Sequence, residues 1–203
     1  MDLHESIRKR RMVRAYEPGR AIPDDVLRRV LDAARRAPAA GNSAQVDLLV
    51  IDEPERFWSL TFPGGRGAPE GSARSTFRWQ GLFDAPTVVV PIVDPGAYVA
   101  RYSEPDKAHA GLAHERAWDP PYWWVDGGMA VENLLLAATA EGLGALFFGL
   151  FGWEERVLGA FGVPEDRRAL GALTLGWPLP DEPSASVKRG RRPLDEVVHR
   201  NHW

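Results

Sequence analysis

Two clusters of basic residues stand near opposite ends of the chain, at residues 8–14 and 188–192. Arginine guanidinium groups bind phosphate oxygens through two parallel hydrogen bonds, so either cluster could contribute to an anion-binding site. A charge run is more often a solvated surface, and each cluster alone could equally be one. The two clusters therefore leave both readings open, a phosphate site and an ordinary polar face.

A turn at Gly41-Asn42-Ser43 is the third place where chemistry could occur. It lies between a predicted helix and a predicted strand, where ligand-contacting loops are common, although the same residues also suit an ordinary turn. The sequence contains no Gly-x-Gly-x-x-Gly fingerprint, no phosphate loop ending in Gly-Lys-Ser/Thr and no Gly-x-Ser-x-Gly elbow. It contains no cysteine, and its five histidines show no metal-ligand spacing, so we predict no metal site.

The composition is that of a globular chain with no electrostatic preference for nucleic acid. The 203 residues are 44% apolar and 26% charged, with a formal net charge of -3. This length suits a single domain, which we assign to residues 1–203. No apolar stretch follows the basic N-terminus, so no signal peptide is predicted and we expect a cytoplasmic protein.

The element that must position these residues is the stretch 126–144, whose apolar residues are nearly contiguous. Such a run is wider than the stripe of a surface helix and predicts a helix buried on most sides, in the core or under a partner subunit. Asp126 is expected to cap its start, and Gly142 and Gly144 to end it. It is too short and too often interrupted by polar residues to span a bilayer. Residues 145–151 follow as a short buried strand and a Gly turn.

The rest of the chain alternates between helices and strands. We predict helices at 3–11, 24–37, 54–60 and 153–161, and strands at 46–51, 86–93 and 168–176. Without repeats or a long linker, this order favours one α+β domain. Long loops at 61–76 and 103–121 could gate access to a site. The tail 177–203, rich in Pro and Arg, either wraps a neighbouring surface or is disordered.

Four segments, in this order, resemble the flavin-dependent nitroreductase family. Residues 7–14 resemble its Arg-Arg-Ser-x-Arg opening, and residues 37–43 resemble its Ala-Pro-Ser-x-x-Asn loop. Residues 128–144 are similar to its central helix, which ends in Gly-Leu-Gly. Residues 175–178 and 191–198 resemble its Leu-Gly-x-Pro strand end and its Arg-x-Pro-Leu-x-Glu-Val tail. The tail and the Phe-Phe-Gly segment look most like an actinobacterial-type subgroup.

The resemblance implies a fold, an assembly and a cofactor. The fold is a nitroreductase-like α+β three-layer sandwich, with a mixed, mainly antiparallel central sheet flanked by helices. The assembly is an obligate homodimer in which a C-terminal arm embraces the partner subunit. FMN is expected at the dimer interface, with NAD(P)H as co-substrate and with no nucleic-acid or membrane partner.

The resemblance also implies which residues bind FMN. Guanidinium groups from both basic clusters are expected to hold its phosphate and ribityl chain: Arg10, Arg11, Arg14, Arg189 and Arg191. One loop is expected at the edge of the flavin ring, with Asn42 as its main contact: Pro38, Ala39, Ala40 and Asn42. Backbone N–H groups near Gly149 and Leu150, just after Phe148, are expected to face flavin N5.

Aromatic residues before the central helix are candidates for the acceptor pocket. These are Tyr122, Trp123 and Trp124, together with Phe148. All four could instead be core residues, because large aromatic side chains are most often buried in packing.

Three departures from the family pattern concern the flavin. Met12 stands where the family has Ser, so this flavin-contacting position has no hydroxyl group. The Gln expected two residues after the Asn is Ala44, and Gln45 is displaced by one position. Arg78 and Gly81 fall where polar flavin contacts are frequent, and Gly81 cannot supply one.

These expectations lead to an FMN-dependent oxidoreductase with a ping-pong mechanism. A nicotinamide donor passes hydride to flavin N5 and leaves, and an electron-poor acceptor such as a nitroaromatic or a quinone takes its place. One alternative is a non-catalytic or repurposed flavin-binding protein for storage, sensing or flavin modification. Another is a reductase with a deazaflavin donor, and a third is a protein-binding module with aromatic patches.

Overall fold

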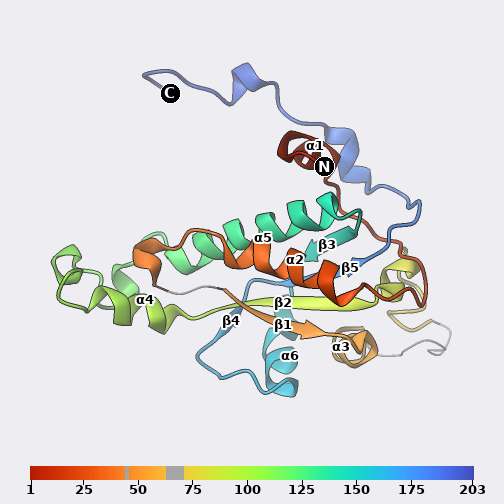
Figure 1. Ribbon diagram of the computed structural model, residues 1–203, viewed down its shortest axis with the longest axis horizontal. Coiled ribbons are helices and arrows are strands. Elements are labelled where there is room, and N and C mark those ends of the chain that lie inside the picture. Colours follow the sequence, from red (N-terminus) through yellow and green to blue (C-terminus); the bar gives the residue numbers. More distant parts are fainter. Residues whose placement is uncertain (44–45, 63–70) are drawn as a thin grey trace.

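The computed structural model of the protein describes residues 1–43, 46–62 and 71–203, and a β-sheet forms its centre (Figure 1). The strands lie in the order β1 (Asp47–Ile51), β2 (Thr87–Val93), β5 (Ala172–Gly176) and β3 (Gly144–Phe148), and β4 (Arg168–Ala169) pairs with β2. Within the described ranges every ladder between these strands is antiparallel, and one isolated parallel bridge joins Met12 to Ala145. The expected mainly antiparallel sheet is confirmed.

Helices cover both faces of the sheet (Figure 1). One face carries α2 (Asp24–Arg35) and α5 (Tyr122–Ala140), and α1 (Leu3–Lys9) packs against α5. The other face carries α3 (Pro54–Thr61) and α6 (Glu154–Ala160), while α4 (Pro95–Tyr102) follows the end of β2. The expected α+β architecture, a sheet between two layers of helices, is confirmed.

Strand β2 shows how the sequence builds a core on each face. Successive side chains of a strand point to opposite faces. Val88 and Val90 pack in one hydrophobic cluster with Trp58 of α3, and Val89 packs in a second cluster with Leu134 of α5. Because all seven residues of β2 are buried, both faces must be apolar, which explains the uninterrupted apolar run in the sequence.

Strand β1 departs from the buried run predicted for residues 46–51. It lies at the edge of the sheet, where Leu48, Leu49 and Val50 are half-buried and only Ile51 is buried. An edge strand has a neighbour on one side only, so its apolar residues are less completely covered. The apolar pattern alone could not distinguish this edge strand from a central one.

The strand predicted for residues 168–176 is interrupted by a β-bulge. Ile92 pairs with Ala169, and Val89 pairs with Leu173. Residues 90 and 91 of β2 therefore face residues 170, 171 and 172, which leaves one extra residue on the β4–β5 side. Gly171 lies in the bulge with φ of 150°, a conformation that favours glycine.

Helix α5 begins earlier than the apolar run predicted. It starts at Tyr122 after Pro121, so Asp126 lies inside the helix and is not its N-terminal cap. The expected end is confirmed, because the helix stops at Ala140 and Gly142 follows with φ of 79°. At 19 residues α5 is about 28 Å long. No helix in the described ranges is long and apolar enough to cross a membrane.

The two predicted long loops and the tail complete the chain. Residues 63–70, half of the loop 61–76, lie outside the described residues, and the loop 103–121 contains only two short 3-10 turns, Ala108–Ala110 and Glu115–Ala117. The last residues, 183–203, leave the body of the molecule and extend past α1 (Figure 1). We call residues 183–203 the C-terminal arm.

Candidate functional site

The first basic cluster continues from α1 along β3, and we call residues 10–14 the Arg14 segment. The Val13 N–H donates to the Ala145 carbonyl at 2.8 Å. The sulfur of Met12 accepts the Phe147 N–H at 3.4 Å, and its side chain packs against the hydrophobic core. Met12 therefore points inward and fixes the segment to β3, so the missing Ser hydroxyl is replaced by a packing contact.

A buried carboxylate, Asp181, holds the Arg14 segment from the other side. It accepts the Arg14 backbone N–H at 2.6 Å and forms an ion pair with the Arg11 guanidinium. Its side chain is 3% exposed, so these two partners offset the loss of water around the charge. Asp181 was not among the predicted site residues, because an acidic residue in a Pro-rich stretch has no spacing that marks it.

The other two arginines of the segment differ in how far their charge is neutralised. Arg10 Nε lies 3.6 Å from a carboxylate oxygen of Glu132 on α5. Arg14 stands 4.9 Å from the ring centroid of Trp79 and donates to the Met12 carbonyl at 3.1 Å. In the described part of the chain no side-chain carboxylate pairs with the Arg14 guanidinium, so its charge remains available to an anionic ligand.

The predicted ring-contacting loop forms a tight turn at Ala40–Asn42, which we call the Asn42 turn. Pro38 and Ala39 lead into it from the end of α2. Gly41 and Asn42 have φ of 64° and 53°, in the left-handed region that glycine and asparagine adopt most readily. Asn42 is exposed, and its side-chain amide has no hydrogen-bond partner among the described residues. The amide is therefore free to meet a ligand.

The loop after β3 carries backbone donors without an acceptor. Among the backbone hydrogen bonds of the described turns and loops, none is donated by Gly149 or Leu150. Phe148 before them is half-buried and stacks on Trp58, with ring centroids 6.2 Å apart. Phe151 after them is 89% exposed and has φ of 44°, which is rare for a bulky residue. Gly149 and Leu150 of this loop were predicted as site residues, whereas Phe151 was not.

The three predicted acceptor-pocket residues have different surroundings. Tyr122 lines a cavity of about 340 Å³ together with Ala40 and Trp118. Trp123 is buried in a small hydrophobic cluster around Trp118, and Trp124 packs against the same cluster. Of the three candidates, Tyr122 alone lines this cavity in the described chain, and Trp123 takes the alternative role of a core residue.

The second basic cluster lies on the C-terminal arm. Residues 185–203 are all exposed, and the hydrogen bonds near the cluster, such as Arg192 Nη2 to the Glu196 carbonyl at 2.5 Å, join residues of the arm itself. Arg189 and Arg191 have no carboxylate partner in the described ranges. No contact joins them to the Arg14 segment within the part of one protomer that the structure describes.

The Arg14 segment and the Asn42 turn lie near opposite ends of α5 (Figure 1). The segment follows α1 and runs beside β3, whereas the turn lies between the end of α2 and α4. The turn contacts α5 at Asp126, whereas the segment runs from Glu132, about 9 Å further along the helix, to Ala145 beyond its end.

Two of the remaining departures from the family pattern, at Gly81 and Arg78, are explained by local contacts. Gly81 packs against Ala15, and a Cβ at Gly81 would come within 2.8 Å of the Ala15 Cβ. Arg78 forms an ion pair with Glu182 at 2.8 Å, at the root of the C-terminal arm. The positions of Ala44 and Gln45 lie outside the described residues.

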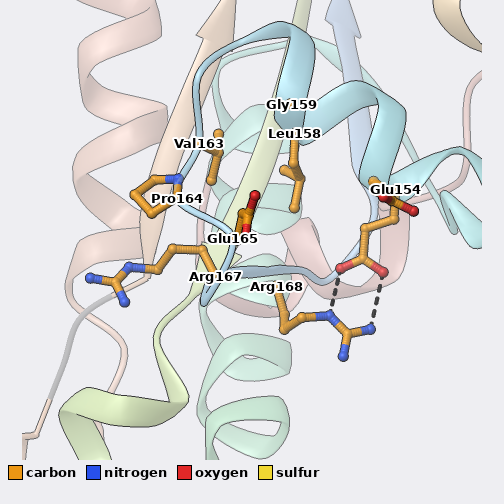
Figure 2. Close-up of a pocket in the computed structure, with 9 residues that line it drawn as sticks. Glu154, Leu158, Gly159, Val163, Pro164, Glu165, Arg167 and Arg168 are labelled. Carbon is orange, nitrogen blue, oxygen red and sulfur yellow. Dashed lines mark hydrogen bonds and ion pairs between the residues drawn. The ribbon is translucent and has the colours of Figure 1, made fainter.

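A second cavity, of about 580 Å³, opens between α6 and the segment that follows it (Figure 2). Glu154 and Arg168 face each other there through two hydrogen bonds of 2.9 and 3.1 Å. The hydrogen bonds from Arg168 hold the pKa of Glu154 below its ordinary value. None of the predicted site residues lines this cavity, and this ion pair connects β4 to α6, so we assign it a structural role.

Known proteins similar to this chain identify its family and its fold. A model of the nitroreductase family matches residues 7–177. A protein of Methanothermobacter thermautotrophicus, assigned as a NADH dehydrogenase/NAD(P)H nitroreductase, is 28% identical over 181 residues, which are 88% of this chain and 78% of that protein. A nitroreductase family protein of Clostridium difficile shares the fold with a TM-score of 0.70 and 22% identity over the whole of both chains. A nitroreductase of Desulfovibrio desulfuricans in complex with FMN gives a TM-score of 0.67 at 22% identity, covering 100% of this chain and 98% of that one.

Proposed function

Because the chain belongs to the nitroreductase family, we propose that it is an NAD(P)H-dependent FMN oxidoreductase with a ping-pong mechanism. Its acceptor is an electron-poor molecule such as a nitroaromatic or a quinone. Bound FMN supplies the hydride chemistry, and the side chains of the protein bind, orient and shield the reactants. The FMN-bound relative supports the cofactor, and the NAD(P)H-linked archaeal relative supports the donor.

The observation that carries this proposal is that the Arg14 segment and the Asn42 turn contact α5 at different places, the turn at Asp126 and the segment from Glu132 to the strand beyond the helix end (Figure 1). Both regions are built in the protomer, and no hydrogen bond or ion pair joins them among the residues that the structure describes. In a two-fold symmetric dimer the segment of one protomer can face the turn of its partner. We therefore propose a homodimer with FMN between the subunits.

The residues present fit the anionic end of FMN. Arg14 offers a guanidinium without a carboxylate partner, and Arg10 has only a long contact of 3.6 Å with Glu132. A phosphate group needs several such donors around it. Arg11 is already paired with Asp181, so its role is to hold the segment more than to bind the phosphate.

The residues present also fit the ring end. The exposed Asn42 amide can donate to and accept from the polar edge of a flavin. The N–H groups of Gly149 and Leu150 have no backbone acceptor among the described loops, and a ring nitrogen would satisfy them. A backbone donor at that point tunes the flavin without requiring a particular side chain.

The C-terminal arm supports the dimer. Five of its large apolar side chains are exposed: Val187, Leu194, Val197, Val198 and Trp203. Full burial of such a side chain contributes about 1.5–3 kcal/mol, so a partner that covers them stabilises the assembly. An arm that embraces the partner would also carry Arg189 and Arg191 toward a site shared between subunits.

One specific observation favours a second candidate function. Met12 packs inward where the family pattern has a hydroxyl, so one polar flavin contact is missing. A non-catalytic flavin-binding protein is the function that this loss favours. Such a protein would bind FMN but would not oxidise a nicotinamide.

Anaerobic stopped-flow absorbance tests the proposal against this alternative. We expect the purified protein to bind FMN, to lose the flavin colour on mixing with NADH or NADPH, and to regain it with a nitroaromatic or a quinone. Bound FMN that keeps its colour with both nicotinamides would favour the non-catalytic protein, or a deazaflavin donor if a reduced deazaflavin bleaches it. A protein that stays colourless when FMN is added would contradict the proposal altogether.

A further inference from the structure

Asp126 is a buried carboxylate that is not among the predicted FMN-binding residues. It lies inside α5 and is 4% exposed. One oxygen, Oδ2, accepts the Ala40 N–H at 2.7 Å and the Tyr98 hydroxyl at 2.9 Å. Asp126 therefore connects α5 to the Asn42 turn on one side and to α4 on the other.

A carboxylate at this position is costly unless it is needed as an acceptor. Removing an ionised group from water is unfavourable, and an apolar side chain of similar size is often at least as stable in such a place. Burial, and next the hydrogen bond to Asp126, raise the pKa of the Tyr98 hydroxyl, so Tyr98 remains a donor. The two donors offset the cost, and one of them belongs to the backbone of the Asn42 turn.

Helix α4 holds the same turn from a second direction. Tyr98, Arg101 and Tyr102 share one face of the helix, at the i, i+3 and i+4 spacing. Arg101 Nε donates to the Gly41 carbonyl at 3.0 Å, and Asp106 orients this guanidinium through two contacts of 2.7 Å. The Tyr102 ring lies so close to Gly41 that a Cβ there would approach it to 2.7 Å.

These contacts determine the path of the backbone just before Asn42. The Ala40 N–H and the Gly41 carbonyl are both bonded to groups outside the turn. Gly41 and Asn42 are thereby kept in the left-handed conformation, which Asn adopts only at some cost. A fixed backbone at Asn42 limits the directions in which its free amide can project.

We propose that Asp126 is a positioning residue for the cofactor. Together with Tyr98, it fixes the Asn42 turn in its left-handed form before any ligand binds. The exposed Asn42 amide can then meet the flavin ring without first being ordered, which favours binding. This inference rests on the proposed function, because the ligand of the turn is taken to be FMN, and Asp126 itself does not touch that ligand.

Four variants of the full-length protein separate positioning from simple stability. Asp126→Ala removes the acceptor, whereas Asp126→Asn removes the charge but keeps an oxygen that can accept from Ala40. Tyr98→Phe removes the second donor without leaving a large cavity. Leu134→Ala is the matched control. Leu134 is fully buried in α5, but it belongs to the hydrophobic cluster around Val89 and not to the one that contains Tyr98.

Two measurements are made on each variant: the FMN dissociation constant, and the hydrogen exchange of the Ala40 amide in the flavin-free protein. We expect Asp126→Ala to raise the dissociation constant at least about tenfold and to speed Ala40 exchange. Asp126→Asn should stay within about threefold of wild type, and Tyr98→Phe should fall between the two. Leu134→Ala should lower the melting temperature but change neither measurement, because opening of a turn is a local event.

Equal FMN affinity in wild type and both Asp126→Ala and Tyr98→Phe would overturn the positioning role. So would an increase in the dissociation constant that follows melting temperature alone, with Leu134→Ala as weak a binder as Asp126→Ala. If Asp126→Ala fails to fold, the Tyr98→Phe measurements decide. Failure of the wild-type protein to bind FMN would instead contradict the proposed function, so the two failures are distinguishable. Faster Ala40 exchange in the flavin-free variants would even then support the fixed turn.

Discussion

The Arg14 segment and the Asn42 turn are built in the same way but differ in charge. Each is fixed by a buried carboxylate that accepts a backbone N–H: Asp181 accepts that of Arg14 at 2.6 Å, and Asp126 accepts that of Ala40 at 2.7 Å. The segment presents guanidinium groups, whereas the turn presents a neutral amide. One region therefore suits a phosphate and the other the polar edge of a ring.

We propose that these regions belong to two different sites of a dimer, because they contact α5 at different places. The turn contacts α5 at Asp126, and the segment runs from Glu132 to Ala145 beyond the helix end (Figure 1). The C-terminal arm adds to this picture, because its arginines and apolar side chains are exposed. We propose that each protomer carries two halves of a site and that a second copy brings unlike halves together.

The largest effect is expected from a substitution in helix α5. Leu135 is buried in α5, and Leu135→Asp would place an unpaired charge in the core, at a cost of more than about 4 kcal/mol. We expect the variant to be unfolded or insoluble by circular dichroism and size-exclusion chromatography. Arg28→Asp, on the exposed side of α2, is the control that should fold. A Leu135→Asp protein that behaves like wild type would mean that this face of α5 is not buried.

Deletion of residues 183–203 separates the arm from the body. Because residues 185–203 are exposed, we expect the body to fold with nearly the wild-type melting temperature. We also expect the dimer to dissociate and FMN affinity to fall by more than about a hundredfold, as two charge-assisted contacts are lost. Light scattering gives the mass and a flavin titration the affinity. A truncated dimer with unchanged affinity would remove the arm from the account.

Single arginine substitutions test whether both basic clusters bind the FMN phosphate. Arg14→Ala and Arg191→Ala should each weaken FMN binding by about 1.5–3 kcal/mol, if each guanidinium makes one charge-assisted hydrogen bond. Arg28→Ala removes an exposed arginine of α2 and should leave the affinity unchanged. Isothermal titration with FMN measures all three, and unchanged affinity in both cluster variants would place the phosphate elsewhere.

The smallest effect is expected at the ion pair in the second cavity (Figure 2). Arg168 holds the pKa of Glu154 below its ordinary value of 4.5. A lowered pKa stabilises the folded state above about pH 4.5, and this contribution disappears as the pH falls through the folded-state pKa. Glu154→Gln should therefore lower the free energy of unfolding by about 0.2–1 kcal/mol at pH 7 and by less at pH 3. Urea unfolding at both pH values checks this, and FMN affinity should not change.

The sequence predicted most of the elements because their signals are local. The apolar run of residues 126–144 indicated the buried helix, and Pro23 with two acidic residues marked the start of α2. What it could not predict depends on contacts between distant residues. Asp126 looked like a cap because Tyr122 and Trp123, which precede it, read equally well as loop or core residues.

For the candidate site, residue types were easier to predict than partners. Spacing identified the basic clusters and the Asn42 turn, but not Asp181, whose partner Arg11 lies 170 positions away. Trp123 and Tyr122 are adjacent and similar in type, yet one is buried and the other lines a cavity. That difference arises because successive residues of a helix point about 100° apart around its axis, so the two side chains meet different neighbours.

The most direct test of a site shared between protomers is subunit complementation. Arg14→Ala and Asn42→Ala proteins are each expected to bind FMN weakly as pure dimers, and they are then mixed so that the subunits exchange. In a mixed dimer one site carries both changes and the other carries neither. The account predicts that FMN binding with wild-type affinity returns at one site per mixed dimer. Mixed dimers whose sites all keep the weak affinity of the single variants would contradict it.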